Sequence, residues 1–123
     1  MARVLKALLN KKTVDFFELK DSRVFIAERN INHIRRKHPI AYEKYYDSIS
    51  EIISCPDYIG RNLENNSMEL IREFFSNEKK FYVKVAVNVD KKGLFYAKTL
   101  YVLNFSKFEL QVFQGYYKKV QNL

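Results

Sequence analysis

The segment between residues 81 and 104 limits the fold more strongly than any other part of the chain. Residues 81–89, FYVKVAVNV, are rich in β-branched and aromatic side chains, a composition that favours a β-strand. Residues 90–93, DKKG, have the composition of a hairpin turn, with Gly93 where a left-handed backbone is needed. Residues 94–104 then form the returning strand. The chain is therefore predicted to contain an antiparallel β-hairpin.

The length of the turn decides which side chains share the open face of this hairpin, and the sequence allows two lengths. A three-residue loop of residues 91–93 pairs Asp90 with Leu94. Basic, amide and aromatic side chains then share one face: Tyr82, Lys84, Asn88, Tyr96 and Lys98.

A two-residue turn shifts the returning strand by one residue and reverses which of its side chains share that face. Lys84 then lies opposite Tyr101 and Asn88 opposite Ala97, with Thr99 on the same face. Either face is suited to stacking bases and contacting phosphates. A strand rich in tyrosine more often reflects ordinary sheet packing, so the pattern does not decide between the two.

The clearest helical periodicity lies in residues 42–53. Six apolar side chains recur there at helical spacing: Tyr42, Tyr45, Tyr46, Ile49, Ile52 and Ile53. This spacing predicts one amphipathic helix whose apolar stripe faces the core. Pro56 ends the helix, and residues 56–60 have the composition of a turn that leads into extended chain.

The remaining elements are predicted to be short. Residues 24–27 and 68–75 are expected as strands, and residues 31–37 as a helix capped by Asn30 and stopped by Pro39. Residues 1–20 are expected to form an arm or a short helix, with the apolar side chains of residues 14–19 packed inward.

A capping box at residues 106–109, SKFE, predicts a last helix that runs to about Gln114 and is closed by Gly115. The order of elements predicts an α+β fold in which helices pack on one face of a small antiparallel sheet. With 123 residues, 47% of them apolar, the chain is long enough for one core, so a single domain over residues 1–123 is expected.

Composition excludes several classes of protein. The single cysteine, Cys55, has no partner for an internal disulfide, and the chain lacks the Cys and His set of a structural zinc site. The longest apolar runs have only a few residues, and the first twelve residues are interrupted too early for a signal peptide. We therefore expect a cytoplasmic protein that does not associate with membranes.

No cofactor is expected either. The chain has only 3 glycines and no glycine-rich phosphate loop, which argues against a nucleotide cofactor. The carboxylates Glu64, Glu69, Glu73 and Asp90 lack the spacing of a metal site. The 22 Lys and Arg residues against 14 Asp and Glu give a net charge of +8, which favours a polyanion as partner.

The two histidines, His33 and His38, lie within the run HIRRKH. At about 100° per residue they point roughly 140° apart on a regular helix, so they need separate interpretations. His38 falls on the apolar stripe with Ile34, where a packing histidine is the simpler explanation. His33 shares its face with Arg36 and Lys37.

A histidine beside two cations suits phosphodiester chemistry. The imidazole of His33 can move a proton near neutral pH, while Arg36 and Lys37 hold a phosphate and oppose its developing charge. A solvated basic helix face is the more common origin of such a pattern. The pattern alone leaves both explanations open.

Three parts of the sequence resemble one known family. They are residues 33–39, HIRRKHP; residues 56–60, PDYIG, preceded by Tyr45, Ile49 and Ile52; and KTLY at residues 98–101. Together they resemble the phage-associated nuclease family grouped with barnase, EndoU, colicin and RelE, over residues 24–104. The resemblance implies a barnase/RelE-like ribonuclease fold and the metal-independent ribonuclease activity of toxins and phage or mobile-element effectors.

The resemblance also implies site residues. His33 and His38 are similar to the family's two helix histidines, and Thr99 with Tyr101 to a polar pair on the late strand, with Lys84 a weaker match. These matches favour the two-residue turn, which brings the three strand residues together. They also point to both histidines, whereas the helical periodicity favours only His33. If the helix ends at residue 37, His38 is free to turn toward the sheet.

We therefore predict an endoribonuclease that cleaves RNA by attack of its 2′-hydroxyl, with a non-catalytic basic RNA- or DNA-binding module of the same fold as the alternative. Five residues are predicted to be catalytic, with His33 ranked first: His33, His38, Lys84, Thr99 and Tyr101. Five are predicted to contact RNA: Arg35, Arg36, Lys37, Lys98 and Tyr82. An acidic antitoxin or immunity protein is expected as a further partner.

Overall fold

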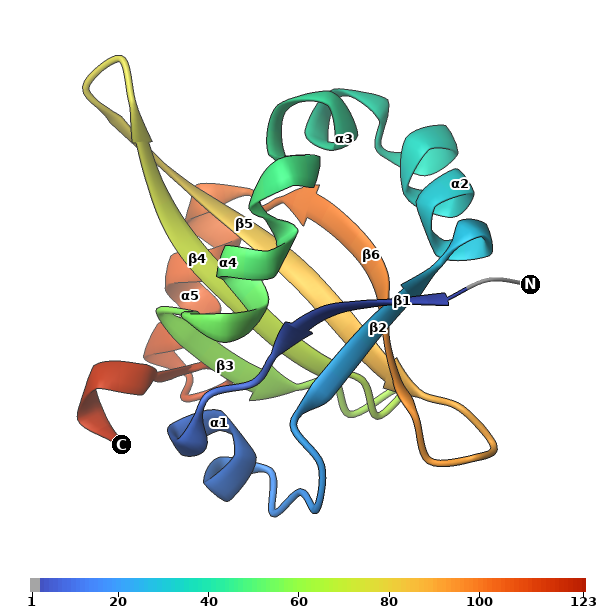
Figure 1. Ribbon diagram of the computed structural model, residues 1–123. Coiled ribbons are helices and arrows are strands. Elements are labelled where there is room, and N and C mark those ends of the chain that lie inside the picture. Colours follow the sequence, from blue (N-terminus) through green and yellow to red (C-terminus); the bar gives the residue numbers. More distant parts are fainter. Residues whose placement is uncertain (1–2) are drawn as a thin grey trace.

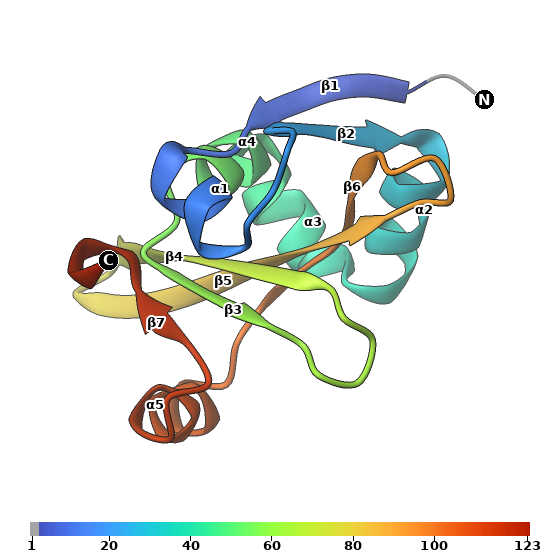
Figure 2. The ribbon, with the colours of Figure 1, turned by 90° about the horizontal axis from the view of Figure 1, so that it is seen from below.

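The computed structural model describes residues 3–123, which form a seven-stranded sheet with helices on both faces (Figures 1 and 2). The strand order is β1-β2-β6-β5-β4-β3-β7. The elements in chain order are β1 Arg3–Leu8, α1 Lys11–Phe16, β2 Arg23–Ala27, α2 Glu28–Lys37, α3 Pro39–Tyr45, the 3-10 helix η1 Tyr46–Ser48, α4 Ile49–Ser54, β3 Tyr58–Arg61, β4 Met68–Ser76, β5 Lys79–Val89, β6 Phe95–Val102, α5 Phe105–Phe113, β7 Lys118–Lys119 and the 3-10 helix η2 Val120–Asn122. The predicted α+β class is confirmed.

The sheet is larger than the small antiparallel sheet that was predicted. Its paired strands are antiparallel except for β2 and β6, which run parallel. β1, which pairs with β2, lies in the segment predicted as an arm or short helix. The rest of that segment holds α1, so the short helix is present, and residues 1 and 2 lie outside the described residues.

The central hairpin combines both predicted registers. Near the turn, Asp90 N–H donates to the Leu94 carbonyl, and Asn88 pairs with Tyr96, as a three-residue loop requires. A bulge then leaves Lys98 without a partner on β5, so farther along Lys84 pairs with Tyr101, as the two-residue turn requires. The bulge is the physical reason that neither single register holds along the whole hairpin.

One face of the sheet carries the main core. Val83, Val85 and Val87 of β5 point to this face and are fully or almost fully buried. Figure 2 shows α1, α2, α3 and α4 on this side, where α2 and α4 contribute buried isoleucines such as Ile34 and Ile52. Period-two alternation along β5 therefore leaves its even-numbered residues for the opposite face.

The opposite face is covered in part by α5, which corrects the prediction that the helices pack on one face only (Figure 2). Phe108 of α5 packs in a second buried cluster with Ile71, Tyr82 and Tyr117. Ile71 and Tyr82 alternate in sequence with residues of the main core, so this cluster lies on the other side of the sheet. The helix begins two residues earlier than the capping box predicted, because the Asn104 side chain accepts from Lys107 N–H.

The predicted helix over residues 42–53 is broken into α3, η1 and α4. Its apolar stripe keeps its role, since Ile49 is fully buried and Tyr45 packs on Phe74 with ring centroids 5.2 Å apart. The break lies at Tyr45, whose backbone angles of φ −123° and ψ 2° leave the helical range. Contacts of the two halves with a twisted sheet thus outweigh the local periodicity.

Gly60 of β3 marks a close approach of the C-terminal segment. A Cβ at this position would lie 2.7 Å from the Tyr116 carbonyl oxygen and 2.8 Å from the Tyr117 ring. We expect Gly60→Ala to lower the free energy of unfolding by about 1–3 kcal/mol, because neither backbone nor ring can move without loss of packing. Urea denaturation measures this change, and an unchanged midpoint would contradict it.

Within residues 3–123, none of the helices is long and apolar enough to cross a membrane.

Candidate active site

The face of the sheet that carries α5 also carries a group of polar side chains. The pairing places Lys84 opposite Tyr101 and Ala86 opposite Thr99, so all four side chains point to this face. The bulge at Lys98 is what brings Thr99 and Tyr101 to it, because it advances the strand by one residue. The strand residues that the resemblance singled out are therefore neighbours.

His38 reaches the same face from the end of α2. The helix ends at Lys37, and His38 has φ −136° and ψ 62°, outside the helical range, before Pro39 begins α3. Its ring stacks on Tyr101 with ring centroids 5.0 Å apart and an angle of 23° between the planes. The helix break expected before Pro39 thus turns His38 toward the sheet, as predicted for that case.

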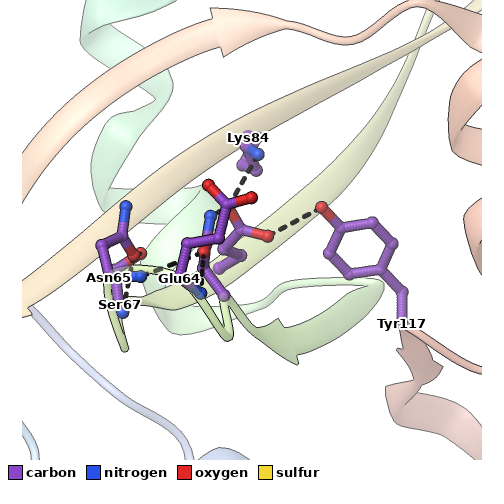
Figure 3. A network of polar contacts seen from close by, with 7 residues as sticks. Glu64, Asn65, Ser67, Lys84 and Tyr117 are labelled. Atoms are coloured by element: carbon purple, nitrogen blue, oxygen red, sulfur yellow. Dashed lines mark hydrogen bonds and ion pairs between the residues drawn. The ribbon is translucent and has the colours of Figure 1, made fainter.

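Lys84 is held in place by a buried ion pair. Its Nζ lies 2.8 Å from Glu69 Oε2, and the two side chains are only 7% and 3% exposed. The hydroxyl of Tyr117 donates to the other carboxylate oxygen of Glu69 at 2.8 Å (Figure 3). On its other side, Lys84 Nζ lies 4.7 Å from the centroid of the Tyr101 ring, within cation–π range.

The surroundings set opposite protonation states for Lys84 and His38. Burial lowers the pKa of Lys84, but its interactions with Glu69 and Tyr101 outweigh burial and raise the pKa above its usual value. Burial, followed by the charges of His33 and Lys37, lowers the pKa of His38. At neutral pH the site therefore combines an ammonium group with a neutral imidazole.

Two buried polar atoms of this face have no hydrogen-bond partner among residues 3–123. They are Thr99 Oγ1 and Asn88 Oδ1. Buried polar atoms in folded proteins are usually bonded, so these two keep hydrogen-bonding capacity on the face that holds Lys84.

His33 lies in a second group of residues at the side of α2. A cavity of about 470 Å³ is lined there by Arg29, Asn30, Asn32, His33, Arg36 and the bulge residue Lys98. A neighbouring cavity of about 270 Å³ shares Arg29, Asn30 and Lys98 and extends to Tyr96 and Asn88. We call these two cavities the basic groove. Lys84 and Tyr101 line a different cavity from His33, whereas His38 stacks on Tyr101, so of the two histidines it is His38 that contacts this strand pair.

The other residues predicted to contact RNA lie in different settings. Arg36 and Lys98 line the basic groove. The guanidinium of Arg35 donates to the Tyr42 hydroxyl at 2.9 Å, and Lys37 is exposed in the last turn of α2. Tyr82 is buried beneath α5, with its hydroxyl 3.0 Å from Glu73.

Sequence reasoning missed Glu69 and Tyr117 as parts of the site. Glu69 was considered only as a metal ligand, although a carboxylate inside the apolar run MELI signals a buried partner of opposite charge. Tyr117 carries no comparable signal, because only the fold brings residue 117 beside residue 69. Within residues 3–123, no three His, Cys, Asp or Glu side chains are grouped as metal ligands.

Comparison with known proteins identifies a family. A family model described as phage-Barnase-EndoU-ColicinE5/D-RelE like nuclease3 matches residues 2–109. The match spans most of the chain and includes both histidines and the three strand residues, and it ends before Tyr117. Neither the curated proteins nor the solved structures gave a match.

Proposed function

Because the chain belongs to the phage-Barnase-EndoU-ColicinE5/D-RelE like nuclease3 family, we propose that it is a metal-independent endoribonuclease that uses the 2′-hydroxyl of RNA as its nucleophile. Family membership implies a nucleic-acid substrate and makes hydrolase chemistry plausible. The observation that carries the finer proposal is the contact of His38 and Lys84 with the same ring, that of Tyr101. The predicted toxin role and acidic protein partner stay predictions.

In the proposed reaction His38 is the general base. Its neutral imidazole takes the proton of the 2′-hydroxyl, the 2′-oxygen bonds to phosphorus, and the bond from phosphorus to the 5′-oxygen breaks. The Tyr101 hydroxyl gives its proton to the leaving 5′-oxygen. The products are a 2′,3′-cyclic phosphate and a free 5′-hydroxyl. Exchange with solvent then removes the proton from His38 and returns one to Tyr101, which restores the enzyme.

Lys84 supplies the electrostatic part of the proposal. A phosphorane-like transition state carries more negative charge on its oxygens than the substrate does, and a fixed ammonium group stabilises that charge. The buried Glu69 carboxylate holds Lys84 in position before substrate arrives, and the Lys84 ammonium, 4.7 Å from the centroid of the Tyr101 ring, stabilises a phenolate formed at Tyr101. Thr99, whose unpaired hydroxyl is buried on the same face, is assigned a positioning role behind the groups that contact the phosphate.

The basic groove is assigned to the RNA backbone. Arg36 and Lys98 contribute two of its cations, and His33 lines the same cavity. Such groups supply the salt-dependent part of RNA affinity without reading sequence. In this assignment His33, ranked first from the helical periodicity, contacts a phosphate outside the reacting centre, and His38 takes the proton.

The test uses a single-stranded RNA and the same oligonucleotide with 2′-deoxyribose at the cleavage position. In the presence of EDTA we expect cleavage of the RNA with a 2′,3′-cyclic phosphate end, and no cleavage of the deoxy-substituted strand, because it lacks the nucleophile. Mass spectrometry identifies the ends.

Two results would contradict the proposal. Loss of cleavage in EDTA would show that the reaction needs a metal ion. Intact RNA together with tight, salt-sensitive binding would favour the alternative of a non-catalytic binding module.

A further inference from the structure

A cavity of about 210 Å³ lies between α5 and the central hairpin, beside the proposed catalytic residues. Its wall from the sheet includes Lys84 and Tyr101, and its wall from α5 includes Phe108 and Gln111. Asn104 and Lys107 complete the α5 side. Lys84 and Tyr101 therefore belong both to this cavity and to the reacting centre, so a ligand in the cavity adjoins the scissile phosphate.

The two sides of α5 differ in chemistry. Positions 104, 107, 108 and 111 share one helix face by their spacing, and three of these four side chains are polar. The cavity on the other side of Phe108 has a volume of about 670 Å³ and is lined mainly by apolar side chains such as Phe105, Val112 and Phe113. Asn104 caps α5, so the polar side chains of this side that the helix itself does not use are Lys107 and Gln111.

The small cavity offers the groups that recognise a nucleobase. The partly exposed Tyr101 ring provides an aromatic side chain against which a base can pack, the buried Phe108 ring provides an apolar wall, and an amide side chain can pair with the edge of the base. Its volume is below the roughly 300–1,000 Å³ of sites for drug-sized ligands, which suits one ring system. Lys84 and Lys107 supply positive charge for the phosphate of the same nucleotide.

Of the two amide side chains in this cavity, Gln111 is the one that is free to form hydrogen bonds with a ligand through both its oxygen and its nitrogen. The side-chain oxygen of Asn104 already accepts from Lys107 N–H at 2.9 Å to cap α5. The side chain of Gln111 makes no hydrogen bond within the part of the chain that the structure describes. Its amide offers both a donor and an acceptor, which is the combination that distinguishes one base from another.

We propose that this cavity binds the nucleobase next to the cleaved bond and that Gln111 determines which base is accepted. This inference rests on the proposed function for its substrate, RNA. It adds to that function a sequence preference at one defined position, and it assigns the preference to a residue just beyond the family match.

The first experiment measures cleavage of a set of RNAs that differ only in the bases flanking the cleavage site. We expect the wild-type protein to prefer one base at one position by about tenfold or more in kcat/KM, as a paired amide provides. Gln111→Ala is expected to remove most of that preference. Gln114→Ala, with the same change on an exposed residue of the same helix end, is expected to keep it.

The second experiment separates this inference from the proposed function. Single-stranded 2′-O-methyl RNAs of each base cannot be cleaved by 2′-hydroxyl attack, so their binding is measured without cleavage. Backbone contacts are common to all of them, so differences in affinity between the bases report the cavity. The inference expects base-dependent affinity that falls about tenfold in Gln111→Ala and not in Gln114→Ala. If the wild type cleaves no RNA, the proposed function is wrong. The binding measurement still tests whether the cavity distinguishes one base from another. Equal affinities in the two variants, or no base preference in the wild type, would overturn the inference.

Discussion

Replacement of His38 by alanine is expected to lower kcat/KM for RNA by about 10²–10⁴-fold, the usual contribution of a general base. The matched control is His33→Ala, which removes the other histidine of the same helix region. His33 lines the basic groove and not the cavity of Tyr101, so its loss is expected to weaken RNA binding and leave kcat nearly unchanged. Steady-state kinetics on one RNA substrate separate the two effects.

The pH dependence of the wild type provides a second readout for the same prediction. A general base must be deprotonated to act, and burial lowers the pKa of His38 below its usual value of 6.5. The acidic limb of kcat/KM is therefore expected to have its midpoint below pH 6.5. His33 also lowers the pKa of His38, so His33→Ala is expected to move this limb toward higher pH.

The assignment of His38 would be wrong if His38→Ala cut RNA as fast as the wild type. It would also be wrong if His33→Ala lost the chemical step and His38→Ala kept it, which is the ranking that the helical periodicity favours. Circular dichroism of both variants checks that the fold is retained.

The difference between the two histidines shows what the sequence can and cannot predict about the site. The helical periodicity predicts which face of α2 each residue lies on, but this prediction is valid only for residues inside the helix. The chain leaves the helical conformation at His38, one residue before Pro39. Proline is visible in the sequence, so the break could be anticipated, whereas the stacking of His38 on Tyr101 depends on the sheet beside it.

The hairpin shows the same difference between local and tertiary effects in strands. Its composition predicted both strands and the turn, because β-branched residues and a left-handed glycine act locally. The bulge at Lys98 was not predicted, since a bulge depends on how the two strands and their neighbours twist together. That one residue decides that Thr99 and Tyr101 share a face with Lys84.

The second large prediction concerns the buried pair of Glu69 and Lys84. Replacement of Glu69 by leucine leaves the Lys84 ammonium buried without its anion, and the Tyr117 hydroxyl without its acceptor. Breaking a buried ion pair in this way costs about 3–5 kcal/mol in the free energy of unfolding. The exposed pair of Lys11 and Asp15 is the control, because Asp15→Ala removes an ion pair of similar length and is expected to leave the midpoint nearly unchanged.

Stability and activity are then separated by replacing the whole network. The triple variant Glu69→Leu, Lys84→Met and Tyr117→Phe removes both buried charges together with the Tyr117 hydroxyl, and apolar replacements of a buried ion pair are often neutral or stabilising. We expect urea denaturation to recover most of the stability lost in Glu69→Leu. Cleavage is expected to stay at least 10²-fold below the wild type, because the ammonium that is proposed to stabilise the transition state is gone. Wild-type cleavage by the stable triple variant would show that Lys84 serves the fold alone. The contrast tests whether a costly buried charge is kept at this position for the reaction and not for the core.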